Sequence, residues 1–533
     1  MFAESKTFLL SKNLTSNKSS FARKRFWLVG VYVLLLIWSG FYRHSQPEKP
    51  VSNDKKIAFV QTIVGEKPQA EKIRFAYKET LSETRTDLLP VILIHGSPGD
   101  AKAFDSLTKL LRDRRIIAVD LPGFGESETN IPDYSIKAHA LYLLELLDEL
   151  TIEKAHIVGF SMGGGVSLEL AESAPNRIAS VSLVSAIGVQ EAELFGDYRV
   201  NHAVHAAQLA ALSALQELVP HFGLFDGGIP YARNFYDSDQ RPLREILQKI
   251  AVPFLITHGA DDPLVPVEAA REHARLVPQS AFVELADNHF YVFMRPEKIS
   301  PILMDFWQSA ENGTAKTRAT ADAERITESQ KPDVPKIIPA KGATVFIFFL
   351  LFVILTFLSE DLAFLLAGIF AAEGWFSFTF AVISCLFGTF AAVFFVFLLG
   401  RFFGQKILQS FLFQRIFKQP TVENFSAQLK NNRLRSIFLN RRFFGFRLPT
   451  YFAAGMLRAQ FWQFLFGFFA SAFCWAFGLI GFSYFAAKGL IATHFINQQN
   501  FWALSVVVFC LYLLLKTGLI LTQRRKVAKT QRN

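Results

Sequence analysis

Short apolar runs alternate with amphipathic stretches between about residues 71 and 308. β-Branched residues are frequent in the runs, and apolar residues recur at helical spacing between them. This alternation is typical of a parallel sheet with crossover helices, so the sequence predicts an α/β fold. The predicted strands are 91–94, 116–119, 156–159, 179–184, 254–257 and 281–285.

A long excursion interrupts the alternation between the fourth and fifth predicted strands. It covers about residues 188–248, and much of it, such as 202–218, is rich in Ala and Leu. The excursion is too long for an ordinary connection between a helix and a strand. We therefore interpret it as a helical cap over an active site.

Long apolar runs lie on both sides of the α/β region. The first, 26–42, carries aromatic residues suited to a membrane interface, and it predicts a transmembrane anchor. Five further runs follow a polar segment and predict an all-α, polytopic membrane domain. They are 343–358, 362–372, 375–399, 460–487 and 501–521.

These patterns divide the chain into seven segments. Polar or charged composition marks the predicted linkers and the basic ends. The segments are a basic cytoplasmic N-terminus (1–25), the anchor (26–42), a linker (43–70), the α/β domain (71–308), a flexible linker (309–340), the membrane domain (341–522) and a basic cytoplasmic tail (523–533).

Composition supports a membrane protein with more than one folded unit. The chain has 533 residues, including 57 Phe, and a net charge of +10, and its mean hydropathy is +0.25. A chain of this length exceeds one core. The basic residues cluster beside apolar runs, which predicts orientation in a bilayer rather than nucleic-acid binding. The three cysteines all lie in apolar segments, and we expect no metal or cofactor.

Charge also predicts the orientation in the membrane. Basic residues at 23–25, in the stretch 401–447 and at 524–526 favour the cytoplasmic side. The sequence thus predicts a multi-pass protein of a bacterial inner (plasma) membrane, with the α/β domain on the extracytoplasmic side. In this topology, residues 343–372 form a re-entrant hairpin that enters from outside.

A Gly-x-Ser-x-Gly motif follows the third predicted strand and precedes a helical pattern. Its residues are Gly159 to Gly163, with Ser161 at the centre. A strand–turn–helix of this kind exposes the serine as a nucleophile, although an ordinary turn with a capping serine would have the same pattern. The loop after the first strand, residues 95–99, would supply an oxyanion donor. We expect the two donors to be the N–H groups of Ser97 and Met162.

The acid and the base of an acyl-transfer site follow later in the chain. Asp262 follows the fifth strand and His289 follows the last, in the order Ser, Asp, His. We therefore assign Ser161 as nucleophile, His289 as base and Asp262 as the residue that orients it. Asp261 is the rival acid. Asp120 precedes the serine, which favours a structural role in a turn.

With these motifs, residues 71–308 resemble an α/β-hydrolase of the esterase/lipase type. The resemblance implies a mostly parallel sheet with a helical cap, and cleavage of a small-molecule or lipid ester through an acyl-enzyme. The loop 95–99 is also similar to that of proline iminopeptidases. However, the segment that begins at Asp120 departs from that branch, so an ester is favoured over a peptide.

Charged residues interrupt the apolar segments of the membrane domain. Glu360 and Asp361 lie between the first two runs, and Arg442 and Arg447 flank an aromatic segment before Pro449. Charges at membrane depth are costly and tend to pair or to line a wet cavity, whereas at the bilayer surface they would mark a turn.

Together with several glycines, these residues resemble the DedA family, also called the SNARE-associated or VTT domain. The resemblance implies two re-entrant hairpins, membrane lipids as partners and a role in lipid movement, with the four charges facing one another. Many bacterial members carry another acid about a dozen positions upstream of Glu360, where this chain has Phe348 and Phe349.

Two other functions remain open from sequence. In one, the chain is a lipid translocase whose hydrolase domain is a regulatory or binding module. In the other, it is a structural membrane scaffold.

Overall fold

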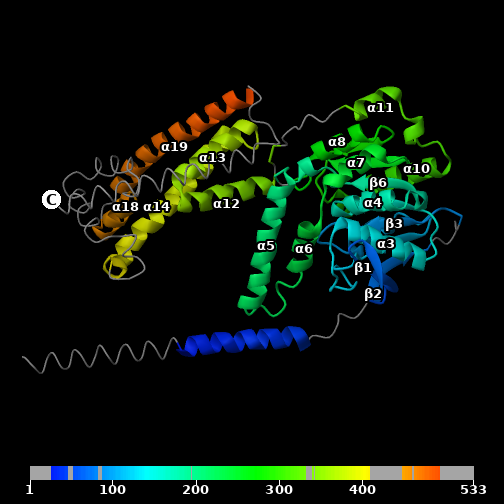
Figure 1. Cartoon of the computed structure of the whole chain (residues 1–533), viewed down its shortest axis with the longest axis horizontal. Helices are drawn as coiled ribbons and strands as arrows, with labels where there is room; N and C mark the ends of the chain where they lie inside the picture. The colour runs from blue at the N-terminus through cyan, green and yellow to red at the C-terminus, as the bar shows by residue number, and fades with distance from the viewer. Residues whose placement is uncertain are drawn as a thin grey trace, which may run out of the picture. The chain divides into compact units, whose positions relative to one another are not determined.

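The computed structural model describes residues 26–45, 52–81, 87–193, 195–331, 339–340, 342–408, 447–458 and 461–492 (Figure 1). The chain divides into two compact units, Met1–Asp333 and Val334–Asn533. The first contains the predicted α/β region and the second the predicted membrane domain.

Eight strands form one sheet in the described part of the first unit, in the order β1-β2-β4-β3-β5-β6-β7-β8. β2 pairs antiparallel with β1 and β4, and every other pair is parallel. The mostly parallel sheet expected from the sequence is thereby confirmed, and its six predicted strands coincide with β3 to β8. The strands are β1 (Lys56–Val64), β2 (Lys67–Thr80), β3 (Val91–Ile94), β4 (Ile116–Val119), β5 (Ala155–Phe160), β6 (Ile178–Val184), β7 (Phe254–Gly259) and β8 (Ala281–Leu285).

The linker predicted over residues 43–70 is wrong from Lys56 onward. This part forms β1 and the start of β2, which pair as an antiparallel hairpin at the sheet edge. Ala58 and Val60 of β1 are buried, whereas Phe59 between them is exposed. Because one face of an antiparallel edge meets water, its strands tolerate the charges that made the segment resemble a linker.

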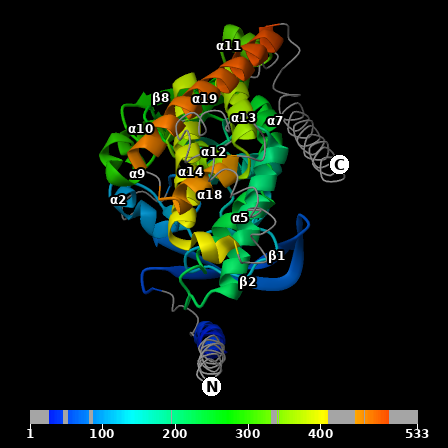
Figure 2. The same cartoon turned by 90° about the vertical axis from the view of Figure 1, so that its left-hand side faces the viewer.

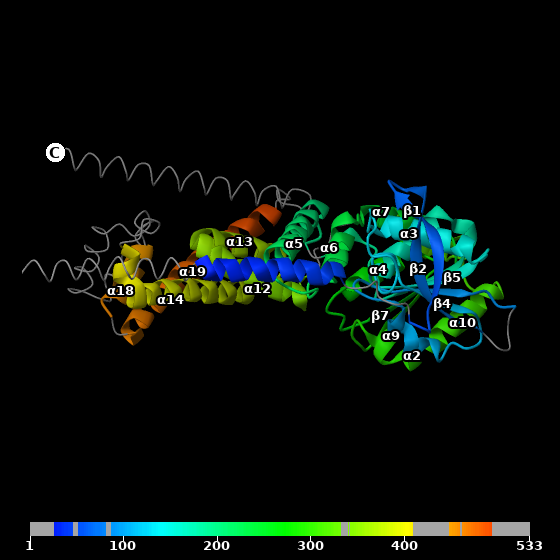
Figure 3. The same ribbon diagram turned by 90° about the horizontal axis from the view of Figure 1, so that it is seen from below.

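Helices cover both faces of the sheet (Figure 3). Alternate residues of each parallel strand enter different cores, so Ile92 packs on one face and Leu93 on the other. The first core includes α3 (Ile136–Glu149), α4 (Met162–Ser173), α7 (Arg241–Lys249) and α8 (Val267–Leu276), and the second includes α2 (Asp105–Thr108), α9 (Tyr291–Met294) and α10 (Ser300–Glu311).

The excursion predicted as a cap is helical. α5 (Tyr198–Leu218) and α6 (Gly228–Asp237) lie side by side (Figures 1 and 3). The Asn234 side-chain amide donates to the carbonyl of Tyr134 at 2.7 Å, and Asp237 accepts from the Tyr134 N–H at 3.1 Å. These bonds tie α6 to the segment that precedes α3.

The flexible linker predicted over 309–340 is wrong for its first part. α10 continues to Glu311, and α11 (Ala323–Ser329) packs back on the domain. The Arg325 guanidinium donates to the carbonyls of Ser280 at 2.9 Å and Ala274 at 3.1 Å. Such long-range bonds produce no periodic pattern in the sequence. The polar composition of this segment therefore predicted a linker although the segment packs on the domain.

The described part of the second unit is helical, as expected. α13 packs on α19 and α14 on α18, where Gly368 and Gly455 allow the backbones to approach closely (Figure 2). The helices are α12 (Ala343–Leu358), α13 (Glu360–Glu373), α14 (Phe378–Leu408), α18 (Arg447–Met456) and α19 (Phe461–Ala492).

Three helices in the described residues are long and apolar enough to cross a membrane. They are Phe26–Ser45, Phe378–Gly404 and Phe464–Leu490, and a shorter apolar helix spans Thr344–Leu358. The expected run 501–521 lies outside the described residues. Whether residues 343–372 re-enter the membrane from outside stays a prediction.

Candidate active site

Ser161 occupies a sharp turn between β5 and α4. Its φ of 53° and ψ of −119° are rare for a residue with a side chain. The surrounding backbone fixes this conformation. The Ser161 N–H donates to Val184 at 3.0 Å, and its carbonyl accepts from Gly164 at 3.0 Å and Ile187 at 3.1 Å. The turn therefore holds Ser161 in a strained position at the carboxyl end of β5.

The glycines of the motif are required by close approach rather than by positive φ. A Cβ at Gly163 would lie 2.5 Å from the carbonyl oxygen of Ile94 and 2.7 Å from that of His95. A Cβ at Gly159 would collide with the Gly163 backbone and the Ser167 hydroxyl. Both positions thus let β5 and α4 close against the end of β3.

Asp262 and His289 meet although 27 residues separate them. The His289 Nδ1 lies 2.6 Å from Asp262 Oδ2, and both residues are buried. The second carboxylate oxygen, Oδ1, accepts from the N–H groups of Leu264 and Val265, each at 2.9 Å. The carboxylate is thus held from both sides, with one oxygen directed at the imidazole.

Hydrogen bonding outweighs desolvation at this carboxylate. Burial acts to raise the pKa of Asp262, but hydrogen bonds from His258, His289 and the Val265 N–H hold that pKa well below its usual range. His258 Nε2 lies 3.3 Å from Asp262 Oδ2 and 2.9 Å from the Val265 carbonyl oxygen. Asp262 is therefore an anion at neutral pH.

The imidazole of His289 lies beside the serine turn. Its ring packs against Phe160, the neighbour of Ser161, with ring centroids 4.8 Å apart. Asp261, the rival acid, is exposed on the turn after β7, where its N–H donates to Asp287 at 3.0 Å. The structure thus brings together His289 and Asp262, not Asp261, next to the turn that carries Ser161.

The loop after β3 lies against the same turn. A Cβ on Gly96 would be 2.9 Å from the Cβ of Ser161, so the backbone before Ser97 is in van der Waals range of the serine. Met162 is the first residue of α4, where an N–H has no acceptor within the helix. The loop after β3 therefore lies against the Ser161 turn, and the expected oxyanion role of the Ser97 and Met162 N–H groups stays a prediction.

His95 holds this loop in place. Leu121 donates its N–H to His95 Nε2 at 3.0 Å, so Nδ1 carries the proton and donates to the Gly96 carbonyl at 2.6 Å. Burial lowers the pKa of His95. A neutral imidazole thus links the loop after β3 to the loop after β4.

Asp120 has structural partners, in agreement with the role expected for it. It pairs with Lys55 at 2.5 Å and accepts the Ala101 N–H at 2.7 Å, and Lys55 also lies 3.5 Å from Glu126. The carboxylates of this cluster hold the loops around the site. Sequence reasoning missed Lys55, because it falls in the predicted linker and no motif marks it.

Glu126 has a strongly perturbed pKa. Burial acts to raise it, but the N–H and hydroxyl of Ser52, together with Lys102 and Lys55, lower the pKa to about 2. The hydrogen bonds from Ser52 to the carboxylate measure 2.8 to 3.0 Å.

The two acidic residues singled out in the second unit lie at the start of α13. Ser359 interrupts α12 and α13 with extended backbone, and Glu360 and Asp361 form the first turn of α13. Asp361 is buried and accepts the indole N–H of Trp475 at 2.7 Å. Arg442 lies outside the described residues, and Arg447 begins α18. The expected meeting of all four charges stays a prediction.

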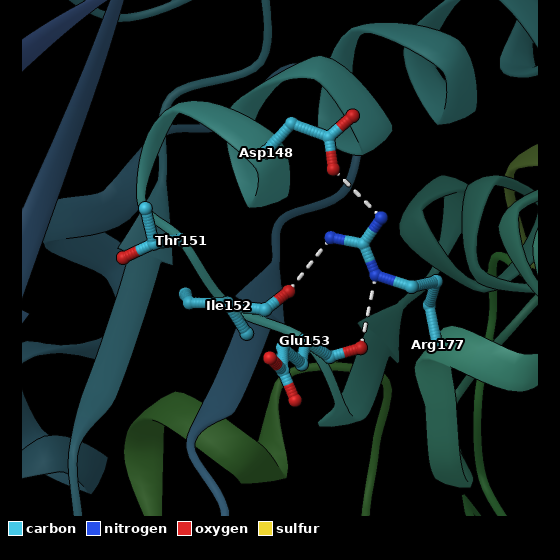
Figure 4. A pocket seen from close by; sticks show the side chains of 5 residues that line it. All are labelled: Asp148, Thr151, Ile152, Glu153 and Arg177. Atoms are coloured by element: carbon cyan, nitrogen blue, oxygen red, sulfur yellow. Dashed lines mark hydrogen bonds and ion pairs between the residues drawn. The ribbon is translucent and has the colours of Figure 1, made fainter.

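A hollow of about 420 Å³ lies at the opposite end of the parallel strands (Figure 4). The Arg177 guanidinium crosses it and donates to Asp148 and to the Ile152 carbonyl, each at 2.7 Å, and to the Glu153 carbonyl at 2.9 Å. These bonds tie the start of β6 to the loop before β5, which is a structural role.

In the described residues, no group of three or more His, Cys, Asp or Glu side chains could hold a metal ion.

Comparison with known families agrees with this architecture. Residues 90–203 match the family model of the alpha/beta hydrolase fold. The chain carries an α/β-hydrolase domain. The matched range includes the serine turn, and a monoacylglycerol lipase is among the similar proteins. The matched range therefore has the alpha/beta hydrolase fold.

Three relatives illustrate the range of similar proteins. The dihydrolipoyllysine-residue acetyltransferase component of the acetoin cleaving system of Pseudomonas putida is 31% identical over 41% of this chain and 63% of its own length. The non-heme chloroperoxidase of Streptomyces lividans is 28% identical over 42% of this chain and 93% of its own. Human monoacylglycerol lipase ABHD6 is 27% identical over 42% of this chain and 76% of its own.

Proposed function

We propose that the first unit is a serine hydrolase that cleaves a carboxylic ester, with a lipid or lipid-linked ester as substrate. The observation that carries the proposal is the 2.6 Å contact between His289 and Asp262 beside the strained turn at Ser161. A buried anion that holds an imidazole next to a serine on a strained turn is the arrangement that acyl transfer requires.

The proposed reaction has two halves. His289 Nε2 takes the proton of the Ser161 hydroxyl as its oxygen attacks the ester carbonyl, and Asp262 stabilises the imidazolium. The N–H groups of Ser97 and Met162 stabilise the oxyanion. His289 then protonates the departing alcohol, and water, deprotonated by the same imidazole, releases the acid from Ser161.

The second unit is proposed as a lipid-handling membrane domain of the DedA type. A buried carboxylate, Asp361, among apolar helices supports this proposal, because such groups mark functional sites in membranes. In this arrangement the domain would present the ester to the hydrolase or remove its product. The chain would then reside in an inner (plasma) membrane with the hydrolase outside.

Two measurements on full-length protein test the hydrolase. Purified protein should react with a serine-directed fluorophosphonate probe and hydrolyse p-nitrophenyl butyrate, and Ser161→Ala should lose both activities. Ser167→Ala is the matched control, since Ser167 lies in α4 and donates to the Gly163 carbonyl. Cleavage of proline p-nitroanilide but not of esters would indicate a peptidase instead. An unreactive wild-type protein would refute the proposal.

A further inference from the structure

The end of α5 and the loop after it expose an apolar surface. This tip, residues 215–226, carries Leu218, which is 62% exposed, and Leu224, which is 83% exposed. Leu215 and Phe222 are exposed beside them. In a soluble environment, exposed apolar side chains in such a cluster mark a contact site.

The tip lies against the N-terminal helix that is long and apolar enough to cross a membrane. The Ser39 hydroxyl accepts from the N–H groups of His221 at 3.1 Å and Phe222 at 3.0 Å, and the Tyr32 hydroxyl donates to the carbonyl of Leu218. In hydrocarbon, backbone N–H groups need such partners because no water is available. The contact suits a site at membrane depth.

Aromatic and charged residues indicate the depth in a membrane at which this contact lies. Trp38 and Tyr42 each pack edge-on against Phe222, with ring centroids 5.4 and 5.8 Å apart. Arg43, the next residue of the helix, lies 3.8 Å from Asp226. Aromatic side chains followed by charges are typical of the boundary between hydrocarbon and headgroups.

The rise of an α-helix gives the depth of Ser39 in the membrane relative to Arg43. Ser39 precedes Arg43 by four residues, which is about 6 Å along a helix at 1.5 Å per residue. Ser39 thus lies just inside the apolar part of the span when Arg43 is at the headgroups. Ser39 contacts His221 and Phe222. The exposed Leu218 and Leu224 beside these residues therefore lie at about the depth of Ser39, just inside the hydrocarbon.

We propose that the tip inserts into the lipid leaflet at the Arg43 end of the N-terminal helix. The partner is the bilayer itself, and the anchor and the tip form one continuous apolar surface that meets it. Insertion of the tip does not depend on the proposed function. Its consequence, that the hydrolase takes an ester held in that leaflet, rests on the proposed function.

Insertion can be measured with a fluorescent label on the full chain in phosphatidylcholine vesicles. An NBD label at Leu224→Cys, with Cys385, Cys474 and Cys510 replaced by Ala, should be quenched by nitroxide-labelled lipids and protected from aqueous iodide. The control label is at Leu81→Cys, since Leu81 is 61% exposed at the end of β2. It should be quenched by iodide.

Two outcomes would overturn the proposal. Iodide quenching at 224 equal to that at 81 would mean that the tip is in water. Protection from both quenchers would mean that a protein segment covers it.

A second measurement connects insertion with substrate access. Leu224→Asp should lower several-fold the hydrolysis of a long-chain p-nitrophenyl ester held in vesicles, and leave that of soluble p-nitrophenyl acetate unchanged. Leu81→Asp should change neither rate. Unchanged hydrolysis of the vesicle-held ester by Leu224→Asp would refute the role in substrate access. If wild-type protein cleaves no ester while the 224 label is quenched by lipid nitroxides, the proposed function fails and insertion stands.

Discussion

Replacing Asp262 by Asn tests whether the carboxylate controls the tautomer of His289. In the structure, Oδ1 accepts two backbone N–H groups, from Leu264 and Val265, and Oδ2 faces His289 Nδ1. An Asn would keep its oxygen where those two N–H groups point. Its NH₂ group would then face the imidazole, so Nδ1 must become an acceptor and Nε2 must carry the proton.

That tautomer cannot remove a proton from Ser161. We expect Asp262→Asn to lower kcat by about 10⁴-fold, the size of effect known for this change in Ser-His-Asp enzymes. At 1.36 kcal/mol per factor of ten, this corresponds to about 5 kcal/mol of transition-state stabilisation. The thermal midpoint should also fall, because the amide keeps the two backbone bonds but loses the anion that His258 and His289 stabilise.

The assay is p-nitrophenyl butyrate hydrolysis by full-length protein in detergent, with unfolding followed on the same samples. Asp261→Asn is the matched control. Asp261 is exposed, and we expect activity within a few-fold of wild type. If Asp262→Asn kept activity within about tenfold of wild type, or Asp261→Asn lost as much, the assignment of the acid would be wrong.

Three further predictions concern packing, acid stability and the second unit. Gly163→Ala should cost about 1–3 kcal/mol in denaturant unfolding and lower esterase activity, since its Cβ would lie 2.5 Å from the Ile94 oxygen, whereas Gly227→Ala, with open space, should do neither. Glu126 has a pKa of about 2, so its ionised carboxylate stabilises the fold above about pH 4.3, and this contribution is lost as the pH falls toward about 2. Glu126→Gln should therefore flatten the pH dependence of the free energy of unfolding in this range. Trp475→Phe removes the 2.7 Å bond to Asp361 and should destabilise the second unit by about 1–3 kcal/mol, measured as a lower midpoint of thermal aggregation in detergent.

The sheet could be predicted from sequence where its strands are buried on both faces. β3 and β4, in which every residue is buried, begin and end at the predicted residues, since a short apolar run between turns has few alternatives in such a sheet. β1 and β2 were missed because their exposed face carries charges. Burial of Phe75 and Ile73 on the other face depends on partners that the local pattern does not contain.

The serine turn is readable from sequence because its requirements are local. Ser161 needs a strand before it, a helix after it and glycines on both sides, and all of these lie within a few residues. The contacts that hold the surrounding loops are not local. Lys55 reaches Asp120 across 65 positions, and no pattern near either residue indicates the pair.

The choice between two adjacent acids shows where sequence reasoning reaches its limit. Asp261 and Asp262 share a turn, a charge and nearly the same distance along the chain to His289. They differ in direction, because the Asp262 N–H bonds back to Gly259 at 3.2 Å and its side chain enters the buried space. There it meets two imidazoles and two N–H groups, whereas Asp261 faces water. Only an environment of that kind can keep a carboxylate both buried and ionised, since each donor offsets part of its lost hydration.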